Sequence, residues 1–137
     1  MNTDELVAHF WPGQQVPHFE HAVALLSNDL KDTICHVGLT ERTILIDELP
    51  VKVAGIGYVC TEEAYQGRGL MHKAMNLAHQ IALDLDLDYA LLNTGHVGLY
   101  EPMGYYRPPN LPYPWMVKAL GEAAWPEDEH ISLQGTW

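Results

Sequence analysis

The sequence predicts a mixed α+β fold in which a central, mostly antiparallel sheet is flanked by helices. Three features lead to this prediction. Short runs rich in apolar and β-branched residues are separated by turn-forming residues, which is typical of strands. One long segment repeats apolar residues at the spacing of a buried helix face. A turn with two glycines joins one of the strand-like runs to this helix.

The first half of the chain contains a candidate helix and three candidate strands. Residues 3–10 precede Trp11-Pro12-Gly13 and predict a short helix that ends at this break. Turn residues at 27–29 and 47–50 separate the strand-like runs, so these runs predict an antiparallel meander. The predicted strands are His21–Leu26, Thr33–Ile46 and Val51–Thr61.

The second half of the chain alternates helical and strand-like patterns. Apolar spacing predicts a helix from about Gly69 to Leu83, and Val97–Met103 predicts a short helix closed by proline and glycine. The proline-rich residues 108–114 predict a loop. The predicted strands are Tyr89–Asn93, Trp115–Leu120 and, near the end, Ile131–Leu133. At this length we expect residues 1–137 to form a single domain.

The chain is strongly acidic. Its 18 Asp and Glu residues exceed its 7 Lys and Arg residues, which gives a formal net charge of −11. Nucleic acid and anionic membranes bind basic surfaces, so we expect neither as a partner. The acidity favours a cationic substrate such as an amine, polyamine or aminosugar, and it is equally consistent with a role in solubility alone.

Targeting segments and cysteine usage predict a cytoplasmic protein. The sequence has no apolar stretch of about eighteen residues, and it begins without the basic and apolar parts of a signal peptide. Cys35 and Cys60 lie in strand-like runs and are interpreted as buried thiols rather than as a disulfide pair. We expect no metal, because the histidines show no spacing typical of a tetrahedral site. The histidines considered are His18, His21, His72 and His79.

The glycine-bearing turn is the strongest functional signal. It reads Gln66-Gly67-Arg68-Gly69-Leu70-Met71. A turn of this kind presents free backbone N–H groups at a helix N-terminus, which together with the helix dipole suit a phosphate or pyrophosphate. The dinucleotide fingerprint needs a third glycine where His72 stands, and the P-loop needs a Gly-Lys-Ser/Thr ending that is absent. The cations close to the turn are Arg68, His72 and Lys73.

This turn resembles the acetyl-CoA loop of the GNAT N-acetyltransferase superfamily, Q/R-x-x-G-x-G/A. Gln66 and Gly69 match its first and fourth positions, while Met71 stands where glycine or alanine is usual. A second motif match follows later in the chain, and the two motifs occur in the order that the superfamily shows.

A second segment, NTGHVGLYEPMGYYRP, is similar to the superfamily motif N-x-x-A-x-x-x-Y-x-x-x-G-F/Y. Asn93, Tyr100, Gly104 and Tyr105 match it, and His96 replaces the usual alanine. The resemblance extends from about Ala22 to Arg107.

Within the superfamily, the sequence is most similar to aminoglycoside 2′-N-acetyltransferases and related small-molecule acyltransferases. The features that carry this looser likeness are HAVALL with TICHVGLTERTILIDELPVKVAGIG before the loop, GLYEPMGYYRP, and the tail WPEDEHISLQGTW. The likeness does not assign a substrate.

The resemblance implies the acyl-CoA N-acyltransferase fold, with acetyl-CoA as cosubstrate. It implies that the loop holds the pyrophosphate through backbone N–H groups, and that the end of the third strand presents backbone groups to the pantetheine arm. The amide of Val59 is the expected donor to the thioester carbonyl oxygen. The expected cofactor-binding residues are Val59, Cys60, Thr61, Gln66, Gly67, Arg68, Gly69, Leu70, Met71 and Asn93.

Tyr100 is the expected catalytic residue, because the matching tyrosine of the family protonates the leaving CoA thiolate. A tyrosine hydroxyl suits this step, since its unperturbed pKa of about 10 lies above the value of about 8.5 for a thiol. Packing in the core is the alternative role for Tyr100.

The general base stays unassigned. Gly55 and Gly57 stand where several family members have a glutamate, and these glycines are compatible with a strand bulge or with close packing. Glu62 and Glu63 lie in a turn where carboxylates are usually solvated. His36 lies in a predicted strand, either as a titrating group or as a hydrogen-bonded core residue.

The predicted function is transfer of an acetyl group from acetyl-CoA to a primary amine of a small, cationic acceptor by direct attack. The alternative is a catalytically degenerate module that binds acyl-CoA as a sensor or partner. Tyr105, Tyr106, Trp115 and loop 108–114 could line an acceptor pocket or pack in the core. About twenty residues precede the first strand, where the family has a strand and two helices. We therefore expect a shortened N-terminal part and a homodimer in which a second subunit completes the acceptor wall.

Overall fold

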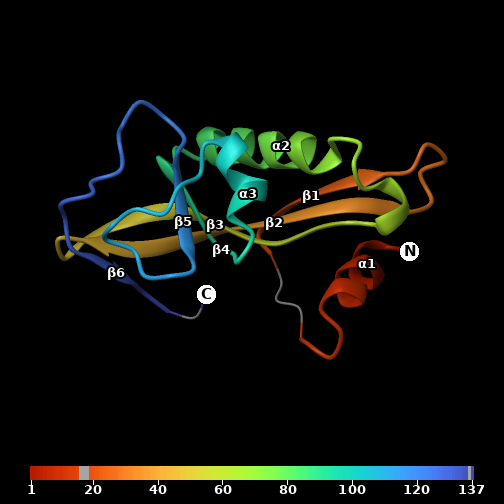
Figure 1. Cartoon of the computed structure of the whole chain (residues 1–137), viewed down its shortest axis with the longest axis horizontal. Coiled ribbons are helices and arrows are strands. Elements are labelled where there is room, and N and C mark those ends of the chain that lie inside the picture. Colours follow the sequence, from red (N-terminus) through yellow and green to blue (C-terminus); the bar gives the residue numbers. More distant parts are fainter. Residues whose placement is uncertain (16–18, 136) are drawn as a thin grey trace. The chain divides into compact units, whose positions relative to one another are not determined.

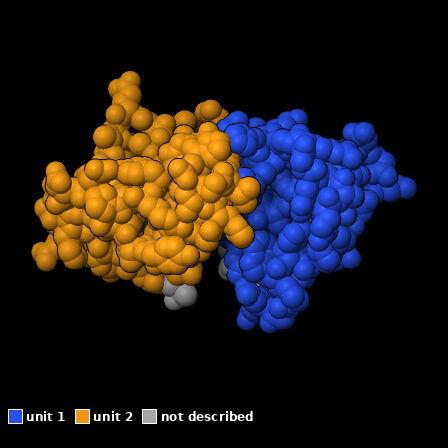
Figure 2. Space-filling model, viewed as in Figure 1, with its two compact units in different colours: residues 1–39, 57–78 blue, residues 40–56, 79–137 orange. Residues whose placement is uncertain are grey.

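The computed structural model of the chain describes residues 1–15, 19–135 and 137. These residues form two compact units, coloured blue and orange in Figure 2. Unit 1 comprises Met1–Leu39 and Gly57–Ala78, and unit 2 comprises Thr40–Ile56 and His79–Trp137.

The described residues form six strands and three α-helices, labelled in Figure 1. The strands are β1 (His21–Leu26), β2 (Thr33–Ile46), β3 (Leu49–Thr61), β4 (Tyr89–Asn93), β5 (Trp115–Ala119) and β6 (Ile131–Leu133). The helices are α1 (Thr3–Phe10), α2 (Leu70–Asp84) and α3 (Val97–Tyr100), with 3₁₀ turns at Glu63–Tyr65 and Glu101–Met103. The strand order is β1-β2-β3-β4-β5, with β6 paired to β2. Strands β3 and β4 pair in parallel, whereas β1–β2, β2–β6 and β4–β5 pair antiparallel. This sheet confirms the predicted fold class.

Unit 1 begins with α1, whose N-terminus has a complete capping box. The Asn2 side chain accepts the Glu5 N–H at 2.8 Å, and the Glu5 carboxylate accepts the Asn2 N–H at 3.3 Å. This reciprocal pair satisfies two donors that a helix start would otherwise leave without partners. Leu6 and Val7 are buried on the inner face of α1 and pack with Cys60 of β3. The helix is therefore part of the core of unit 1.

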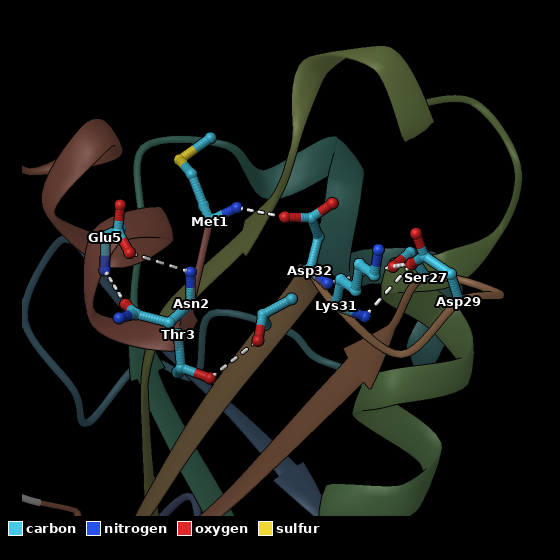
Figure 3. A network of polar contacts seen from close by, with 9 residues as sticks. Met1, Asn2, Thr3, Glu5, Ser27, Asp29, Lys31 and Asp32 are labelled. Atoms are coloured by element: carbon cyan, nitrogen blue, oxygen red, sulfur yellow. Dashed lines mark hydrogen bonds and ion pairs between the residues drawn. The ribbon is translucent and has the colours of Figure 1, made fainter.

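A polar network joins α1 to the β1–β2 hairpin of unit 1 (Figure 3). The Met1 ammonium pairs with the Asp32 carboxylate, and the Met1 carbonyl accepts the Thr33 N–H at 2.8 Å. The hydroxyl groups of Thr3 and Thr33 are hydrogen-bonded at 2.9 Å. Strands β1 and β2 pair antiparallel from His21 opposite Leu39 to a bulge before Leu26. The start of α1 is thereby held against one end of these strands.

Unit 2 has its core around β4. Strand β4 pairs antiparallel with β5 over its whole length and parallel with β3 at two positions, Ala54 with Ala90 and Gly55 with Leu91. β4 is buried except for its last residue, Asn93. Because side chains on both of its faces are buried, β4 is a nearly continuous apolar run. The buried core residues are Ile44, Val53, Tyr89, Leu91, Leu111, Val117 and Trp125.

The chain that follows β5 closes the core of unit 2 through aromatic side chains. Trp125 packs edge-on against Tyr89 at a centroid distance of 5.1 Å, and its indole N–H donates to the Asn110 side chain at 2.8 Å. The Tyr89 hydroxyl donates to the Ala124 carbonyl at 2.9 Å. The polar ends of both rings therefore have partners while their apolar bodies are buried.

Two elements begin at a different residue from the one that the sequence predicts. The predicted turn at residues 47–50 is a tighter connection, because Asp47 and Glu48 adopt φ values of 51° and 69°. Two consecutive positive φ values give a two-residue hairpin turn, so β3 begins at Leu49 rather than Val51. Helix α2 begins at Leu70, because Gly69 has a φ of +76°. No helix of the described residues combines the length and apolarity needed to cross a membrane.

Candidate functional site

The turn between β3 and α2 has the geometry of an anion-binding loop. Gly67 and Gly69 adopt φ values of 79° and 76°, a region that favours glycine. A Cβ at either position would meet nothing within 4 Å, so conformation rather than space requires these glycines. The Lys73 N–H donates to the Gly69 carbonyl at 3.2 Å. The N–H groups of residues 70–72 precede this bond and have no acceptor within the helix.

Side chains of the turn hold it to β3. The Gln66 amide donates to the Thr61 carbonyl at 3.0 Å. The Arg68 guanidinium donates to the Ala64 carbonyl at 3.3 Å and lies over the Tyr65 ring, 5.0 Å from its centroid. The loop conformation is therefore fixed by contacts within unit 1. A loop organised in this way loses little entropy when an anion binds.

A groove with a volume of about 580 Å³ lies beside this loop in unit 1. Arg68 and Lys73 line it together with Asp29 and Asp32. The two carboxylates already have partners. Asp29 accepts from the Ser27 hydroxyl at 2.6 Å, which lowers its pKa, and Asp32 pairs with the Met1 ammonium. Arg68 and Lys73 make no ion pair within the described residues, so this groove has cationic groups available for an anionic ligand.

Strand β3 has its irregularity at Tyr58. This residue has a φ of 51°, while the sequence analysis had placed a possible bulge at Gly55 or Gly57. Gly55 instead serves close packing, because a Cβ there would lie 2.9 Å from the Arg42 side chain. The close-packing alternative therefore describes Gly55, and the positive φ lies one residue after Gly57. At this position the Tyr58 carbonyl accepts a hydrogen bond from His36 of β2 at 2.8 Å.

His36 is a buried, hydrogen-bonded residue rather than an accessible base. It is 3% exposed, and burial lowers its pKa. Its Nδ1 must carry the proton, because the partner is a carbonyl oxygen that can only accept. Glu63 is exposed and pairs with His9 at 2.8 Å. The expectation of a solvated carboxylate is wrong for Glu62, whose Oε2 is buried without a hydrogen-bond partner in the described residues.

The residues expected along the pantetheine arm follow Tyr58 at the end of β3. Val59 and Thr61 are half-buried, and Cys60 is 6% exposed. Burial raises the pKa of Cys60 to about 12, so it is a thiol at neutral pH and is unsuited to act as a nucleophile. Cys35 is also buried and free, and its sulfur accepts the Thr61 hydroxyl at 3.4 Å. The interpretation of both cysteines as buried thiols is confirmed.

Two expected site residues belong to unit 2. Asn93 is the exposed last residue of β4, and Tyr100 is the last residue of α3. Tyr100 is 8% exposed, and burial raises its pKa. A tyrosine with a raised pKa is protonated at neutral pH, which an acid requires. The other expected site residues, Val59–Thr61 and Gln66–Met71, lie together in unit 1.

A buried side-chain pair that the sequence did not reveal adjoins Tyr100. The Tyr105 ring packs edge-on against Tyr100 at a centroid distance of 5.9 Å. The Tyr105 hydroxyl and His79 Nε2 are hydrogen-bonded at 2.8 Å. Burial, with a smaller contribution from Lys118, lowers the pKa of His79 to about 4. His79 is therefore neutral at pH 7, and its position on the buried face of α2 was the only sequence signal.

The aromatic residues considered for an acceptor pocket have other contacts. Tyr105 is 2% exposed in the core of unit 2. The Tyr106 hydroxyl donates to Glu127 at 2.8 Å, and Trp115 packs edge-on against Trp137 at 5.0 Å. The packing alternative therefore describes Tyr105. His18 lies outside the described residues, and within those residues no group of three or more His, Cys, Asp and Glu side chains could hold a metal ion.

Comparison with known proteins identifies one family model. The acetyltransferase (GNAT) domain model matches residues 13–107, which include the loop, Asn93 and Tyr100. No curated protein sequence matches the chain.

Solved structures with a similar fold include proteins named as acetyltransferases or acyltransferases. An acyl-CoA N-acyltransferase structure from Klebsiella pneumoniae is 20% identical with a TM-score of 0.65, covering 86% of this chain and 89% of that one. A GNAT family acetyltransferase from Brucella melitensis, solved with acetyl-CoA, is 15% identical with a TM-score of 0.63, covering 96% and 72%. An Escherichia coli GNAT family N-acetyltransferase, solved with CoA, is 14% identical with a TM-score of 0.62, covering 75% and 60%. The chain spans less than a third of several longer solved chains that it also matches.

Proposed function

Because the chain belongs to the acetyltransferase (GNAT) domain family, we propose that it transfers an acetyl group from acetyl-CoA to a primary amine of a small, cationic acceptor. The observation that carries this proposal is the loop before α2. Its two left-handed glycines and the free N–H groups of residues 70–72 fit a pyrophosphate. We take residues 1–137 as one catalytic domain.

The cofactor is proposed to bind mainly through backbone groups. The loop Gln66–Met71 would hold the pyrophosphate, with Arg68 and Lys73 supplying positive charge from the adjoining groove. The end of β3, Val59–Thr61, would pair with the pantetheine arm in the manner of an added strand. Asn93 would contact the same arm from β4. Backbone recognition suits this chain, because its net charge of −11 leaves few cations for an anionic ligand.

The proposed reaction is direct attack of a neutral amine on the thioester. The amine nitrogen bonds to the carbonyl carbon, and the carbonyl oxygen takes up negative charge that the Val59 N–H would stabilise. The C–S bond then breaks, and the thiolate takes a proton from the Tyr100 hydroxyl. The amine loses its extra proton to water, and Tyr100 is reprotonated from solvent. No side chain is assigned as the base.

The acceptor is proposed to be cationic because of the charge balance. An excess of 11 negative charges attracts a polyamine or aminosugar and raises its local concentration. A homodimer is proposed to complete the acceptor site, since α1 packs in the core of unit 1. Light scattering at assay concentration measures this directly. A dimer supports a shared site, and a strict monomer contradicts it.

Two measurements test the proposed function. Isothermal titration with acetyl-CoA, desulfo-CoA and ATP tests the donor, and we expect both CoA compounds to bind and ATP to bind more weakly. Release of free CoA across a panel of amines tests the transfer. Binding without release for any amine would favour the second candidate, a non-catalytic acyl-CoA sensor, which Met71 in the loop favours. Binding of ATP alone would contradict both.

A further inference from the structure

Tyr58 has a positive φ, which its residue type does not favour. Five described residues other than glycine have a positive φ: Leu30, Asp47, Glu48, Tyr58 and Asp86. The other four lie in turns or bends, whereas Tyr58, with a φ of 51°, lies inside strand β3. A bulky residue in this region is strained and persists only where its surroundings hold it.

His36 supplies one of the contacts that hold Tyr58. Its Nδ1–H donates to the Tyr58 carbonyl at 2.8 Å from β2, the strand next to β3. The imidazole is 3% exposed, so water does not compete for this bond. Loss of the donor would leave a carbonyl in a buried setting without this partner.

Aromatic rings also pack against the side chains of His36 and Tyr58. Phe19 packs against both His36 and Tyr58, at centroid distances of 5.8 and 5.5 Å, and Trp11 packs edge-on against Tyr58 at 4.8 Å. Phe19 reaches this position over Gly38, where a Cβ would lie 2.5 Å from its ring. The rotamers of His36 and Tyr58 are therefore restricted by packing.

The hydrogen bond of His36 acts on the same peptide group that contains the Val59 N–H. The peptide between Tyr58 and Val59 is planar and trans, so its C=O and N–H bonds point in opposite directions. Anchoring the oxygen at His36 fixes the direction of the Val59 N–H, away from the imidazole. A carbonyl that accepts a hydrogen bond also polarises its peptide, which strengthens the N–H as a donor.

We propose that His36 is a positioning residue that orients and polarises the Val59 N–H, with Phe19 and Trp11 holding Tyr58 in its conformation. The role rests on the proposed function, in which this N–H stabilises the thioester oxygen. His36 neither touches the substrate nor exchanges protons with it. It acts through one peptide group, and this explains why a buried neutral histidine stands beside a strained tyrosine.

The tautomer of His36 tests the arrangement in the unmodified protein. Nitrogen-15 NMR of the imidazole should show the proton on Nδ1 at neutral pH. A proton on Nε2 alone would overturn the proposal, because Nδ1 could not then donate to Tyr58. This measurement needs no variant, so it is informative even where a substitution prevents folding.

Variants of His36 test its effect on Val59 and on turnover. His36→Leu removes the donor, and we expect the Val59 amide resonance to move more than its neighbours and kcat to fall about tenfold. Removing such a donor outright costs about a hundredfold or more, so a misaimed donor costs less. KM for acetyl-CoA should stay within about twofold. His36→Asn places a side-chain amide near the position of Nδ1. It should restore much of the wild-type Val59 amide shift and of kcat.

Val37→Ala is the matched control. Val37 is buried next to His36 but points to the opposite face of β2, so its loss lowers stability without reaching Tyr58. An equal fall in kcat in this variant, or an unmoved Val59 amide in His36→Leu, would overturn the proposal. A wild type that transfers no acetyl group, together with a Val59 amide resonance that still moves in His36→Leu, would contradict the proposed function. That result would support the contact by which His36 orients the Tyr58–Val59 peptide.

Discussion

The candidate residues of unit 1 present backbone N–H groups, whereas Tyr100 of unit 2 presents a buried side chain. In unit 1, the loop and the end of β3 present backbone N–H groups, and the side chains of Gln66 and His36 hold this backbone in place. In unit 2, the buried hydroxyl-bearing rings of Tyr100 and Tyr105 stand beside His79. The proposed donor binding therefore depends on local backbone conformation, whereas the proposed acid depends on burial.

Tyr100→Phe should have the largest effect. The change removes the proposed acid and leaves the ring, so kcat should fall about a hundredfold or more. The dissociation constant for CoA should change little, because backbone groups of unit 1 bind it in this account. Free CoA release and isothermal titration measure the two effects.

Tyr89→Phe is the control for Tyr100→Phe. It also removes a hydroxyl from unit 2, one that donates to the Ala124 carbonyl, and it should lower stability without lowering kcat. Equal turnover in wild type and Tyr100→Phe would show that unit 2 supplies no acid, and the comparison between the units would fail.

A fall in pH should lower the free energy of unfolding through protonation of His79. The pKa of His79 is lowered to about 4 in the folded protein, against about 6.5 in the unfolded chain. The unfolded chain therefore takes up a proton first, so stability is complete above about pH 6.5 and falls as the pH drops toward 4. At about pH 4.5 the loss from this group is about 2 kcal/mol of unfolding free energy.

Urea unfolding at pH 7 and at about pH 4.5 measures the contribution of His79. His79→Gln should flatten the loss in acid, because glutamine can still bond to Tyr105 but does not titrate. His72→Gln, an exposed histidine of the same helix, should leave the loss unchanged. The same acid loss in wild type and His79→Gln would contradict the assignment.

Gly69→Ala should have the smallest effect, and it tests unit 1 alone. Alanine at a φ of +76° is strained, so the loop should hold its N–H groups less well and CoA binding should weaken about tenfold. Gly121→Ala places a methyl group at ordinary contact distance from Asp88 without a positive φ, and should leave binding unchanged. Unchanged affinity in Gly69→Ala would show that the loop conformation does not matter.

Sequence patterns were sufficient wherever a feature depends on nearby residues. The helix period before Leu83 and the glycines at 67 and 69 each act within a few positions of the chain. For this reason the element order and the loop could be predicted. The family resemblance added Asn93 and Tyr100, which spacing alone would not have distinguished from core residues.

The features that could not be predicted depend on partners far apart in the sequence. Tyr58 has a positive φ where its carbonyl is hydrogen-bonded to His36 on the next strand, and the adjacent Gly57 did not indicate this position. His79 and Tyr105 are separated by 26 positions. Trp125 closes the core of unit 2 from a segment without strand or helix pattern, through Asn110. Each needs the folded arrangement to become visible.

The division between proposed donor binding in unit 1 and the proposed acid in unit 2 is tested by comparing Gly69→Ala with Tyr100→Phe in one assay of acetyl-CoA binding and turnover. We expect Gly69→Ala to weaken acetyl-CoA binding about tenfold and to leave kcat within about twofold. We expect the opposite for Tyr100→Phe, with kcat reduced about a hundredfold and binding unchanged. Loss of kcat in Gly69→Ala with full turnover in Tyr100→Phe would contradict this division.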